Sequence, residues 1–209
     1  MLKFLIALLA FSVFLPGGFS QISAETKKDY AGADTCMTCH EEKYKSYSQT
    51  AHGIETDIRA PAAKQTCETC HGAGLSHAEK GGGRGVGDVI PLSVGSRTPV
   101  EKINATCMQC HASGRRALWA GSMHQMRGLA CTNCHNPHGG LPNNLARPTE
   151  VEVCTQCHKQ IKAMLQLPSH HPVREGKLNC SDCHNPHGTA TEKLISANYV
   201  NEKCYECHA

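Results

Sequence analysis

The chain has 209 residues, including 14 cysteines and 14 histidines, and its formal net charge at pH 7 is +3. Aromatic residues make up only 5% of the sequence, with a single tryptophan, Trp119. A chain of this length normally buries a sizeable aliphatic and aromatic core. The composition therefore excludes an ordinary side-chain core, and we expect something other than side chains to fill the interior.

The N-terminus is typical of an export signal. The apolar run Phe4–Leu15 is too short to span a bilayer as a helix, which needs about 20 residues. We predict a signal peptide over residues 1–24, cleaved after Ala24 or, as second choice, after Ser20. The exported domain would then cover residues 25–209. An uncleaved membrane anchor is the alternative interpretation.

Beyond the signal, the chain has no other long apolar run and no sustained amphipathic pattern. Short helices are expected at Glu41–Ser48, Arg115–Met126 and Val151–Leu165. The glycine-rich stretch Gly81–Val100 is expected to be a surface loop or extended connector. The predicted fold class is mostly irregular backbone with short α-helices and little or no strand.

The pattern Cys-x-x-Cys-His occurs seven times and uses all 14 cysteines. Positions i, i+3 and i+4 lie on one face of a helical turn, so both sulfurs and the imidazole point the same way. The two sulfurs can then bond the vinyl groups of one porphyrin while the histidine ligates its iron, and this pattern is the attachment motif of haem c. The copies, numbered motifs 1 to 7, have the cysteine pairs Cys36/Cys39, Cys67/Cys70, Cys107/Cys110, Cys131/Cys134, Cys154/Cys157, Cys180/Cys183 and Cys204/Cys207, and the proximal histidines His40, His71, His111, His135, His158, His184 and His208.

Two other uses of paired cysteines compete with this interpretation. Structural zinc sites contain Cys-x-x-Cys elements, but zinc does not require a histidine directly after each pair. A disulfide framework suits an exported chain, but it explains neither the two-residue spacer nor the histidine. Seven matches out of seven favour seven covalently bound haem c groups.

Seven further histidines are candidates for the distal axial positions. In the repeated sequence HNPHG, only two residues separate His138 and His187 from the motif histidine before them, and three extended steps cover about 10–11 Å. That reach does not carry the chain around a porphyrin, so each should ligate a different haem from its neighbour. The adjacent His170 and His171 serve either two haems or one. The full set is His52, His77, His124, His138, His170, His171 and His187, with Met123, Met126 or Met164 as substitutes if one histidine is not used.

The spare histidines also reveal an internal repeat. Each unit has a first motif, a histidine 16 or 17 residues after its first cysteine, a second motif and a close-following histidine. The predicted two-haem units cover about 36–80, 107–140 and 154–190, and an incomplete fourth starts at 204. Packed haems would form the core of this arrangement.

The stretches CMTCHEEKYKSYSQTAH, CETCHGAGLSH, SHHPVREGKLNCSDCHNPHG and CYECHA resemble the periplasmic decahaem cytochromes of outer-membrane electron conduits. The resemblance implies thioether attachment at the cysteine pairs, proximal ligation by the motif histidines and distal ligation by the histidines of TAH, LSH, SMH, SHH and NPH. It also implies a periplasmic protein, in possible association with the outer membrane. The implied redox partners are an inner-membrane quinol dehydrogenase or periplasmic cytochrome upstream, and an outer-membrane porin with a surface cytochrome or reductase downstream. This sequence has seven motifs where the family has ten.

The predicted function is electron transfer along seven mostly bis-histidine haems, toward the outer membrane or an extracellular or terminal reductase, without a catalytic site. The haem propionates turn the formal charge negative, which excludes nucleic acid as a partner, and no direct membrane span is expected. The alternative is a multihaem oxidoreductase that reduces a small nitrogen or sulfur oxyanion at one iron with an open position. The seventh motif, in the unfinished unit, is where an open haem would be expected.

Overall fold

A computed structural model describes residues 29–139, 141 and 144–208. The predicted signal peptide and its cleavage point lie outside the described residues. None of the described helices combines the length and apolar character needed to cross a membrane.

The described chain is built from short helices joined by turns. The α-helices are α1 (Ala33–Tyr47), α2 (Cys67–His71), α3 (Leu75–Glu79), α4 (Val100–Met108), α5 (Met123–Met126), α6 (Glu150–Thr155), α7 (Lys159–Met164) and α8 (Val200–Tyr205). The 3-10 turns are η1 (Ala51–Gly53), η2 (Pro61–Ala63), η3 (Gly114–Arg116), η4 (Cys131–Asn133), η6 (Cys180–Asp182) and η7 (Glu192–Leu194). Within the described ranges the backbone forms no strand, only two isolated bridges, His135 with Leu145 and His184 with Ile195. The predicted fold class is confirmed.

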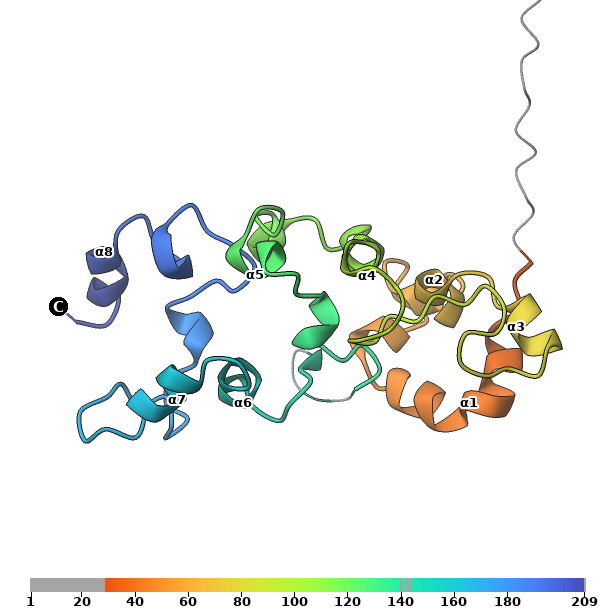
Figure 1. The fold of residues 1–209 in the computed structure, drawn as a ribbon, viewed down its shortest axis with the longest axis horizontal. Helices are drawn as coiled ribbons and strands as arrows, with labels where there is room; N and C mark the ends of the chain where they lie inside the picture. The colour runs from red at the N-terminus through yellow and green to blue at the C-terminus, as the bar shows by residue number, and fades with distance from the viewer. Residues whose placement is uncertain (1–28, 140, 142–143, 209) are drawn as a thin grey trace, which may run out of the picture.

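The molecule is elongated, and chain order follows its long axis (Figure 1). In this view α1 and α3 lie at one end and α8 lies at the other, with α4, α5 and α6 between them. Helices α4, α5 and α8 form one row and α1, α6 and α7 form a second row beside it. Motifs that are neighbours in sequence are therefore placed as neighbours along the axis.

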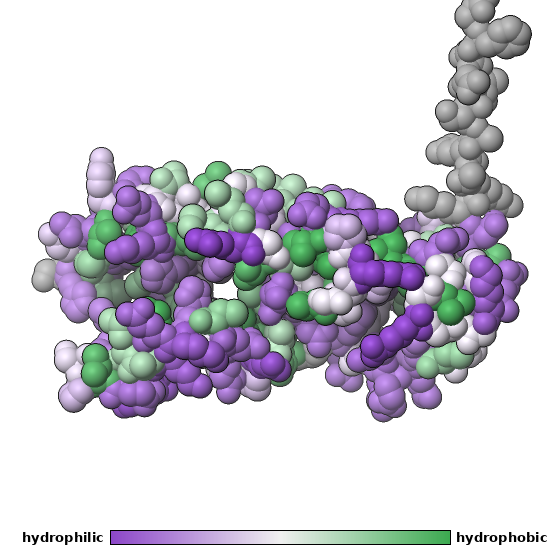
Figure 2. Space-filling view, viewed as in Figure 1, coloured by the Kyte–Doolittle hydropathy of each residue, from purple (hydrophilic) through white to green (hydrophobic). Residues whose placement is uncertain are grey.

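The side-chain core is thin. Among the described residues the buried hydrophobic side chains are Tyr47, Ala60, Ile103, Ala130 and Val153, and none of the large side chains is fully buried. Figure 2 shows hydrophilic residues over most of the visible face and openings between the elements. Burial of side chains therefore contributes little to this fold, as the low aromatic content predicts.

Two of the three predicted helices are shorter than expected. Arg115–Met126 forms only the turn η3 and the helix α5, because Gly121 between them has a positive φ of 82°. Val151–Leu165 is divided into α6 and α7 at His158, whose ψ of 62° is not helical. The first prediction, Glu41–Ser48, falls on the second half of α1, which begins eight residues earlier and contains motif 1. The sequence prediction missed α4.

Candidate haem-binding sites

Each motif closes a single helical turn. In motifs 3 to 7 the amide N–H of the histidine donates to the carbonyl oxygen of the first cysteine, at 2.9–3.1 Å. Motifs 1 and 2 lie inside α1 and α2. A bond between residues i and i+4 places both cysteines and the histidine on one side of the turn. This is the local geometry needed to attach one porphyrin at two points and to ligate its iron from the same side.

Six motif histidines each face one spare histidine. The ring centroids are 5.8–6.4 Å apart, and the pairs are His40/His77, His71/His138, His111/His52, His135/His187, His158/His124 and His208/His171. Simple packing of aromatic rings would not select one motif histidine and one spare histidine in every pair. Neither HNPHG histidine faces the motif histidine that precedes it, which is the arrangement that the short spacing requires.

The spacing of these pairs fits an iron between two imidazoles. A metal–imidazole bond is about 2 Å long, so two such bonds plus the ring radii separate the centroids by roughly 6 Å. The residues present therefore fit a haem whose iron has one axial histidine on each face. When bound, such a haem supplies a one-electron couple, and two histidine ligands give it a lower potential than a methionine ligand would.

Hydrogen bonds orient several of these rings. The Nδ1 atoms of His71, His77 and His124 lie 2.8–2.9 Å from backbone carbonyl oxygens of Ile90, Val86 and Pro186. A carbonyl can only accept, so Nδ1 carries the proton in each ring and Nε2 keeps its lone pair for a metal. The same hydrogen bond occurs in motif 6, where His184 Nδ1 donates to Lys193 O at 2.8 Å.

Burial lowers the pKa of several of the ligand candidates and so favours the neutral imidazole, which is the form that binds a metal. The pKa of His187 is lowered to about 4, first by desolvation and then by the nearby positive charges of His135, Arg116 and Arg115. Desolvation also lowers the pKa values of His52, His111 and His138.

The adjacent histidines His170 and His171 differ. His171 faces His208. Both ring nitrogens of His170 are already hydrogen-bonded, Nδ1 to Leu167 O and Nε2 to the carboxylate of Glu175 at 3.1 and 3.2 Å. The structure therefore brings His171, but not His170, to another imidazole.

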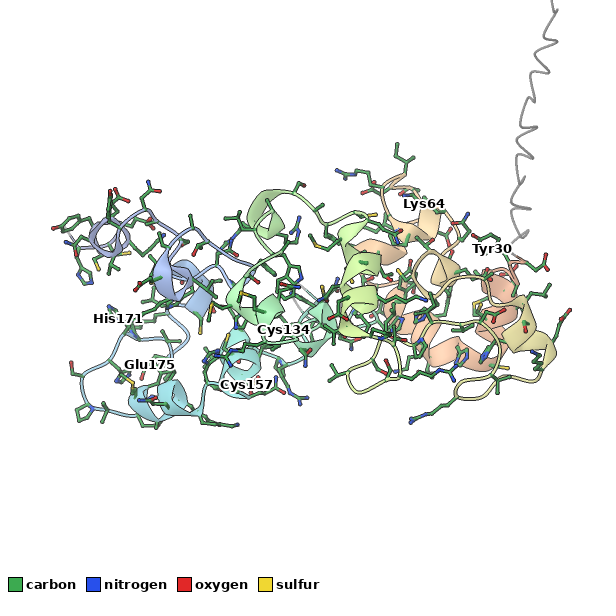
Figure 3. All side chains as sticks on the ribbon, turned by 45° about the horizontal axis from the view of Figure 1, so that its top comes forward. Tyr30, Lys64, Cys134, Cys157, His171 and Glu175 are labelled. Carbon is green, nitrogen blue, oxygen red and sulfur yellow. The ribbon has the colours of Figure 1, made fainter. Side chains whose placement is uncertain are left out.

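Cysteines of consecutive motifs lie near one another all along the described chain. The first cysteines of motifs 1 and 2, 3 and 4, and 5 and 6 lie next to each other in pairs: Cys36/Cys67, Cys107/Cys131 and Cys154/Cys180. Between these pairs, the second cysteine of each even motif lies near the next motif: Cys70 near Cys107 and Cys110, Cys134 near Cys157, and Cys183 near Cys204 and Cys207. Figure 3 shows Cys134 and Cys157 side by side near the middle of the molecule. Because each sulfur is an attachment point for a porphyrin edge, the order of attachment points along the molecule follows motif number.

Six of the 14 cysteines are exposed: Cys39, Cys110, Cys157, Cys183, Cys204 and Cys207. The Sγ atom of Cys39 accepts a hydrogen bond from the hydroxyl of the adjacent Thr38 at 3.8 Å. Thioether attachment at each of the 14 cysteines stays a prediction from the spacing of the motifs.

Three side chains link the motifs of a pair, and we call them bridging residues. Glu68, in motif 2, accepts hydrogen bonds from the backbone N–H groups of Ala31, Gly32 and Gly74 at 2.7–3.0 Å. Two further bridging residues, Asn104 and Glu150, act on motifs 4 and 6. Asn104 accepts from the N–H of Cys131 at 2.8 Å, and Glu150 accepts from the N–H and hydroxyl of Ser181.

The glycine-rich connector, 81–100, has a role that its composition did not predict. It carries the carbonyl groups of Val86 and Ile90 that orient His77 and His71. Gly87, with φ of 68°, lies so close to His77 that an added Cβ would be 2.5 Å from the backbone nitrogen of His77. Glycine is required there because no side chain fits the approach.

A structural metal site is the alternative interpretation. Among the described residues one cluster of possible metal ligands occurs. Donor atoms of Glu150, Cys154 and Cys180 lie within 4.8 Å of one another. Both cysteines belong to Cys-x-x-Cys-His motifs, and Glu150 is already bonded to Ser181. All 14 cysteines are free, so none takes part in a disulfide.

Comparison with known proteins points the same way as the geometry. Residues 67–146 match the family model described as "Cytochrome c-type protein NrfB-like", and residues 170–209 match the model "Doubled CXXCH motif". The chain is 38% identical to "Multiheme cytochrome MtrA" of Shewanella baltica, over 90% of this chain and 58% of that protein. It is 23% identical to "Dissimilatory sulfite reductase MccA" of Wolinella succinogenes, over 68% of this chain and 27% of that protein. The chain thus spans 58% or less of these relatives.

The matches cover motifs in both halves of the described chain, and the seven motifs have the helical turns that haem attachment requires, six of them with a facing imidazole. The chain belongs to the multihaem c-type cytochromes and binds haem c through its Cys-x-x-Cys-His motifs.

Proposed function

We propose that this protein carries electrons in the periplasm along seven covalently bound haems, at least six of which have two histidine ligands. The observation that carries the proposal is that a cysteine of each motif lies near a cysteine of the next, from motif 1 to motif 7. Thioether bonds at neighbouring cysteines would place successive porphyrin edges next to each other. An electron entering at one end could then pass through every haem in chain order.

The chain's own residues would hold and tune this array. The cysteines fix each porphyrin, the motif histidines ligate from one face, and the spare histidines ligate from the other. Backbone carbonyls such as those of Ile90 and Val86 hold the imidazoles in the tautomer that binds metal. A haem iron with a histidine ligand in each of its two axial positions has no open position for a substrate. This arrangement suits electron transfer rather than catalysis.

The proposed setting is the periplasm, with export by the N-terminal segment and electron flow toward the outer membrane or an extracellular or terminal reductase. This setting rests on the similarity to "Multiheme cytochrome MtrA" and on the apolar run Phe4–Leu15. The proposed partners are redox proteins: a quinol dehydrogenase or periplasmic cytochrome upstream, and a porin with a surface cytochrome or reductase downstream.

The test is voltammetry of the haem-loaded protein adsorbed on an electrode, together with the intact mass. The mass should correspond to seven haems, and all seven should exchange electrons through a single contact at low potential. A Cys131→Ala/Cys134→Ala variant, which removes the fourth haem, should slow exchange with the haems beyond it. The matched Cys204→Ala/Cys207→Ala variant removes a haem at the end and should leave the other six connected. Equal behaviour of the two variants would contradict a linear path.

A second candidate function is reduction of a sulfur or nitrogen oxyanion. The similarity to "Dissimilatory sulfite reductase MccA" favours it, although that match covers only 27% of the relative. Turnover of sulfite or nitrite with a reduced viologen dye, lost when one haem is removed, would support this function in place of simple electron transfer.

A further inference from the structure

Buried polar atoms without a partner gather at the site of motif 4. Among the described residues, the buried side-chain atoms that make no hydrogen bond are Arg116 Nε, Trp119 Nε1, Thr132 Oγ1 and His187 Nδ1. Thr132 lies inside motif 4, and the ring of His187 faces the histidine of that motif, His135, at 6.0 Å. Folded proteins pair nearly all of their buried polar groups. Unpaired groups at one haem site therefore indicate that the ligand of the site is their partner.

Two of these donors come from a single turn. The 3-10 turn η3 ends at Arg116, and the backbone N–H of Trp119 donates to the carbonyl oxygen of Arg116 at 2.9 Å. Side chains three residues apart in such a turn lie one above the other. The indole of Trp119 also lies beside the imidazole of His187, with ring centroids 6.4 Å apart. The turn thus brings both donors to the distal histidine of motif 4.

Backbone contacts fix the loop of His187 against this turn. The side-chain amide of Asn185 donates to the carbonyl oxygen of Arg115 at 2.8 Å. Gly188 approaches the carbonyl oxygen of Leu118 so closely that an added Cβ would overlap it. The residues on both sides of His187 are therefore tied to the turn, and the unpaired donors are held together without bonding to one another.

The unpaired nitrogen atoms define the chemistry of their partner. The Nε of Arg116 and the Nε1 of Trp119 each carry a hydrogen and can only donate. When the Nε2 of His187 binds iron, its Nδ1 carries the hydrogen and is a third donor. The partner must therefore be an acceptor.

Positive charge also gathers at this site. Arg116 lowers the pKa of His187, as do Arg115 and His135, and Arg116 lowers the pKa of His111 as well. An acceptor with a negative charge is favoured among such groups, and guanidinium groups bind carboxylates especially well. Each haem c brings two carboxylates of its own, the propionates, so the residues fit the group.

Resting on the proposed seven-haem array, we infer that Arg116 and Trp119 bind a propionate of the motif 4 haem. The haem is that of motif 4 because the indole lies beside His187, which faces His135. The guanidinium charge favours reduced iron over oxidised iron, since a haem becomes more negative when it gains an electron. Arg116 and Trp119 therefore hold the potential of the fourth of seven haems above the value that its two imidazoles alone would give.

Ultraviolet resonance Raman spectroscopy of the haem-loaded protein tests the contact. Trp119 is the single tryptophan of the chain, so the band that reports hydrogen bonding of the indole N–H belongs to it alone. The band should indicate a hydrogen-bonded N–H. It should shift in Cys131→Ala/Cys134→Ala, which lacks the motif 4 haem. It should stay in place in the matched variant Cys107→Ala/Cys110→Ala, which lacks the motif 3 haem.

Redox titration of all seven haems tests the consequence. Arg116→Gln and Trp119→Phe should each lower one of the seven potentials and leave the other six unchanged. Arg116→Lys keeps the charge and should give a smaller shift than Arg116→Gln. The control Arg84→Gln removes the same charge at an exposed position in the connector 81–100 and should change no potential. Electron paramagnetic resonance during the titration should assign the shifted haem to the class with nearly parallel imidazoles, because the rings of His135 and His187 are 13° apart.

A free indole N–H in the haem-loaded protein would overturn the inference, and so would a band that shifts with the motif 3 haem instead. Unchanged potentials in Arg116→Gln would also overturn it, and this arm decides if Cys131→Ala/Cys134→Ala does not accumulate. Each of these results leaves the proposed function intact as long as voltammetry of the unaltered protein connects all seven haems. Loss of that connection would instead contradict the proposed function.

Discussion

The bridging residue Glu68 offers a sharp test of how the N-terminal haem sites are held together. The residue is only 5% exposed, and its carboxylate accepts from three backbone N–H groups, those of Ala31, Gly32 and Gly74. A hydrogen bond to a charged acceptor contributes about 1.5–3 kcal/mol, and a buried donor left without a partner costs about 1–3 kcal/mol. The Ala31 and Gly32 groups lie at the start of α1, which carries motif 1, so Glu68 joins motif 2 to motif 1.

Glu68→Gln and Glu68→Ala should weaken this link to different degrees. In glutamine the remaining oxygen can still accept from Ala31 and Gly74, which bond to the same Oε1, while the amide NH₂ faces the N–H of Gly32. We expect a local loss of about 2 kcal/mol for glutamine and about 4 kcal/mol for alanine. Since about 1.4 kcal/mol is a factor of ten, the glutamine variant should lose about thirtyfold in hydrogen-exchange protection, and the alanine variant more.

The assay is hydrogen–deuterium exchange of the oxidised, haem-loaded protein, read by mass spectrometry on peptides that cover residues 29–40 and 72–80. Exposed Glu79 in α3 provides the matched control, because Glu79→Gln removes the same charge without removing these bonds. If Glu68→Ala changes protection no more than Glu79→Gln does, the reasoning about Glu68 is refuted.

Further predictions concern other close contacts in the structure. Gly188→Ala should destabilise the folded protein by about 2 kcal/mol or more, because Gly188 has a φ of 124° and a Cβ there would overlap the carbonyl oxygen of Leu118. The midpoint of unfolding in guanidinium should therefore fall far more than it does for Gly139→Ala, whose Cβ meets the side chain of Asn136. Asn104→Ala should lower the free energy of unfolding by about 2 kcal/mol in the same assay, since Asn104 is only 6% exposed and its side chain bonds to Cys131 N and Leu129 O. The control Asn198→Ala, at an exposed position, should have little effect. Equal unfolding midpoints for the two variants would contradict the bridging role of Asn104. The close approach of Gly87 to His77 predicts that Gly87→Ala alters the absorption of the haem of motif 1, whereas Gly95→Ala, with open space around it, leaves the spectrum unchanged.

Local features of the sites could be predicted from sequence because they depend on neighbouring residues. The spacing of Cys-x-x-Cys-His defines a helical turn, and the structure closes that turn in every motif. The short HNPHG link restricts where His138 and His187 can reach, and their rings face the histidines of earlier motifs. The low aromatic content predicted a thin core, which the structure has.

Long-range pairing could not be predicted, because spacing does not define which distant ring or sulfur a side chain meets. His52 faces His111, and His124 faces His158, and each pair joins two of the predicted units. The choice between His170 and His171 depends on the position of Glu175, five residues further on, which no motif marks. The sequence did contain one indication of a bridging residue. The residue after the first cysteine is the acidic Glu68 in motif 2, whereas the other motifs have methionine, threonine, serine or tyrosine there.

Helix boundaries were missed for a physical reason. Two motif histidines interrupt the helical backbone: His158 separates α6 from α7, and His40 has non-helical φ and ψ angles within α1. Helical periodicity continues through such positions, so Val151–Leu165 was predicted as one helix although it is two.

The central claim is that six pairs of imidazoles ligate six haems, and electron paramagnetic resonance of the oxidised protein tests it most directly. Three pairs have nearly parallel rings, at 13–17°, and three have steeply crossed rings, at 60–70°. Nearly parallel axial imidazoles give rhombic low-spin spectra, and steeply crossed ones give low-spin spectra with a large maximal g value. For these six haems the account predicts both low-spin classes in equal amounts. Several high-spin irons, or a single low-spin class, would contradict the pairing.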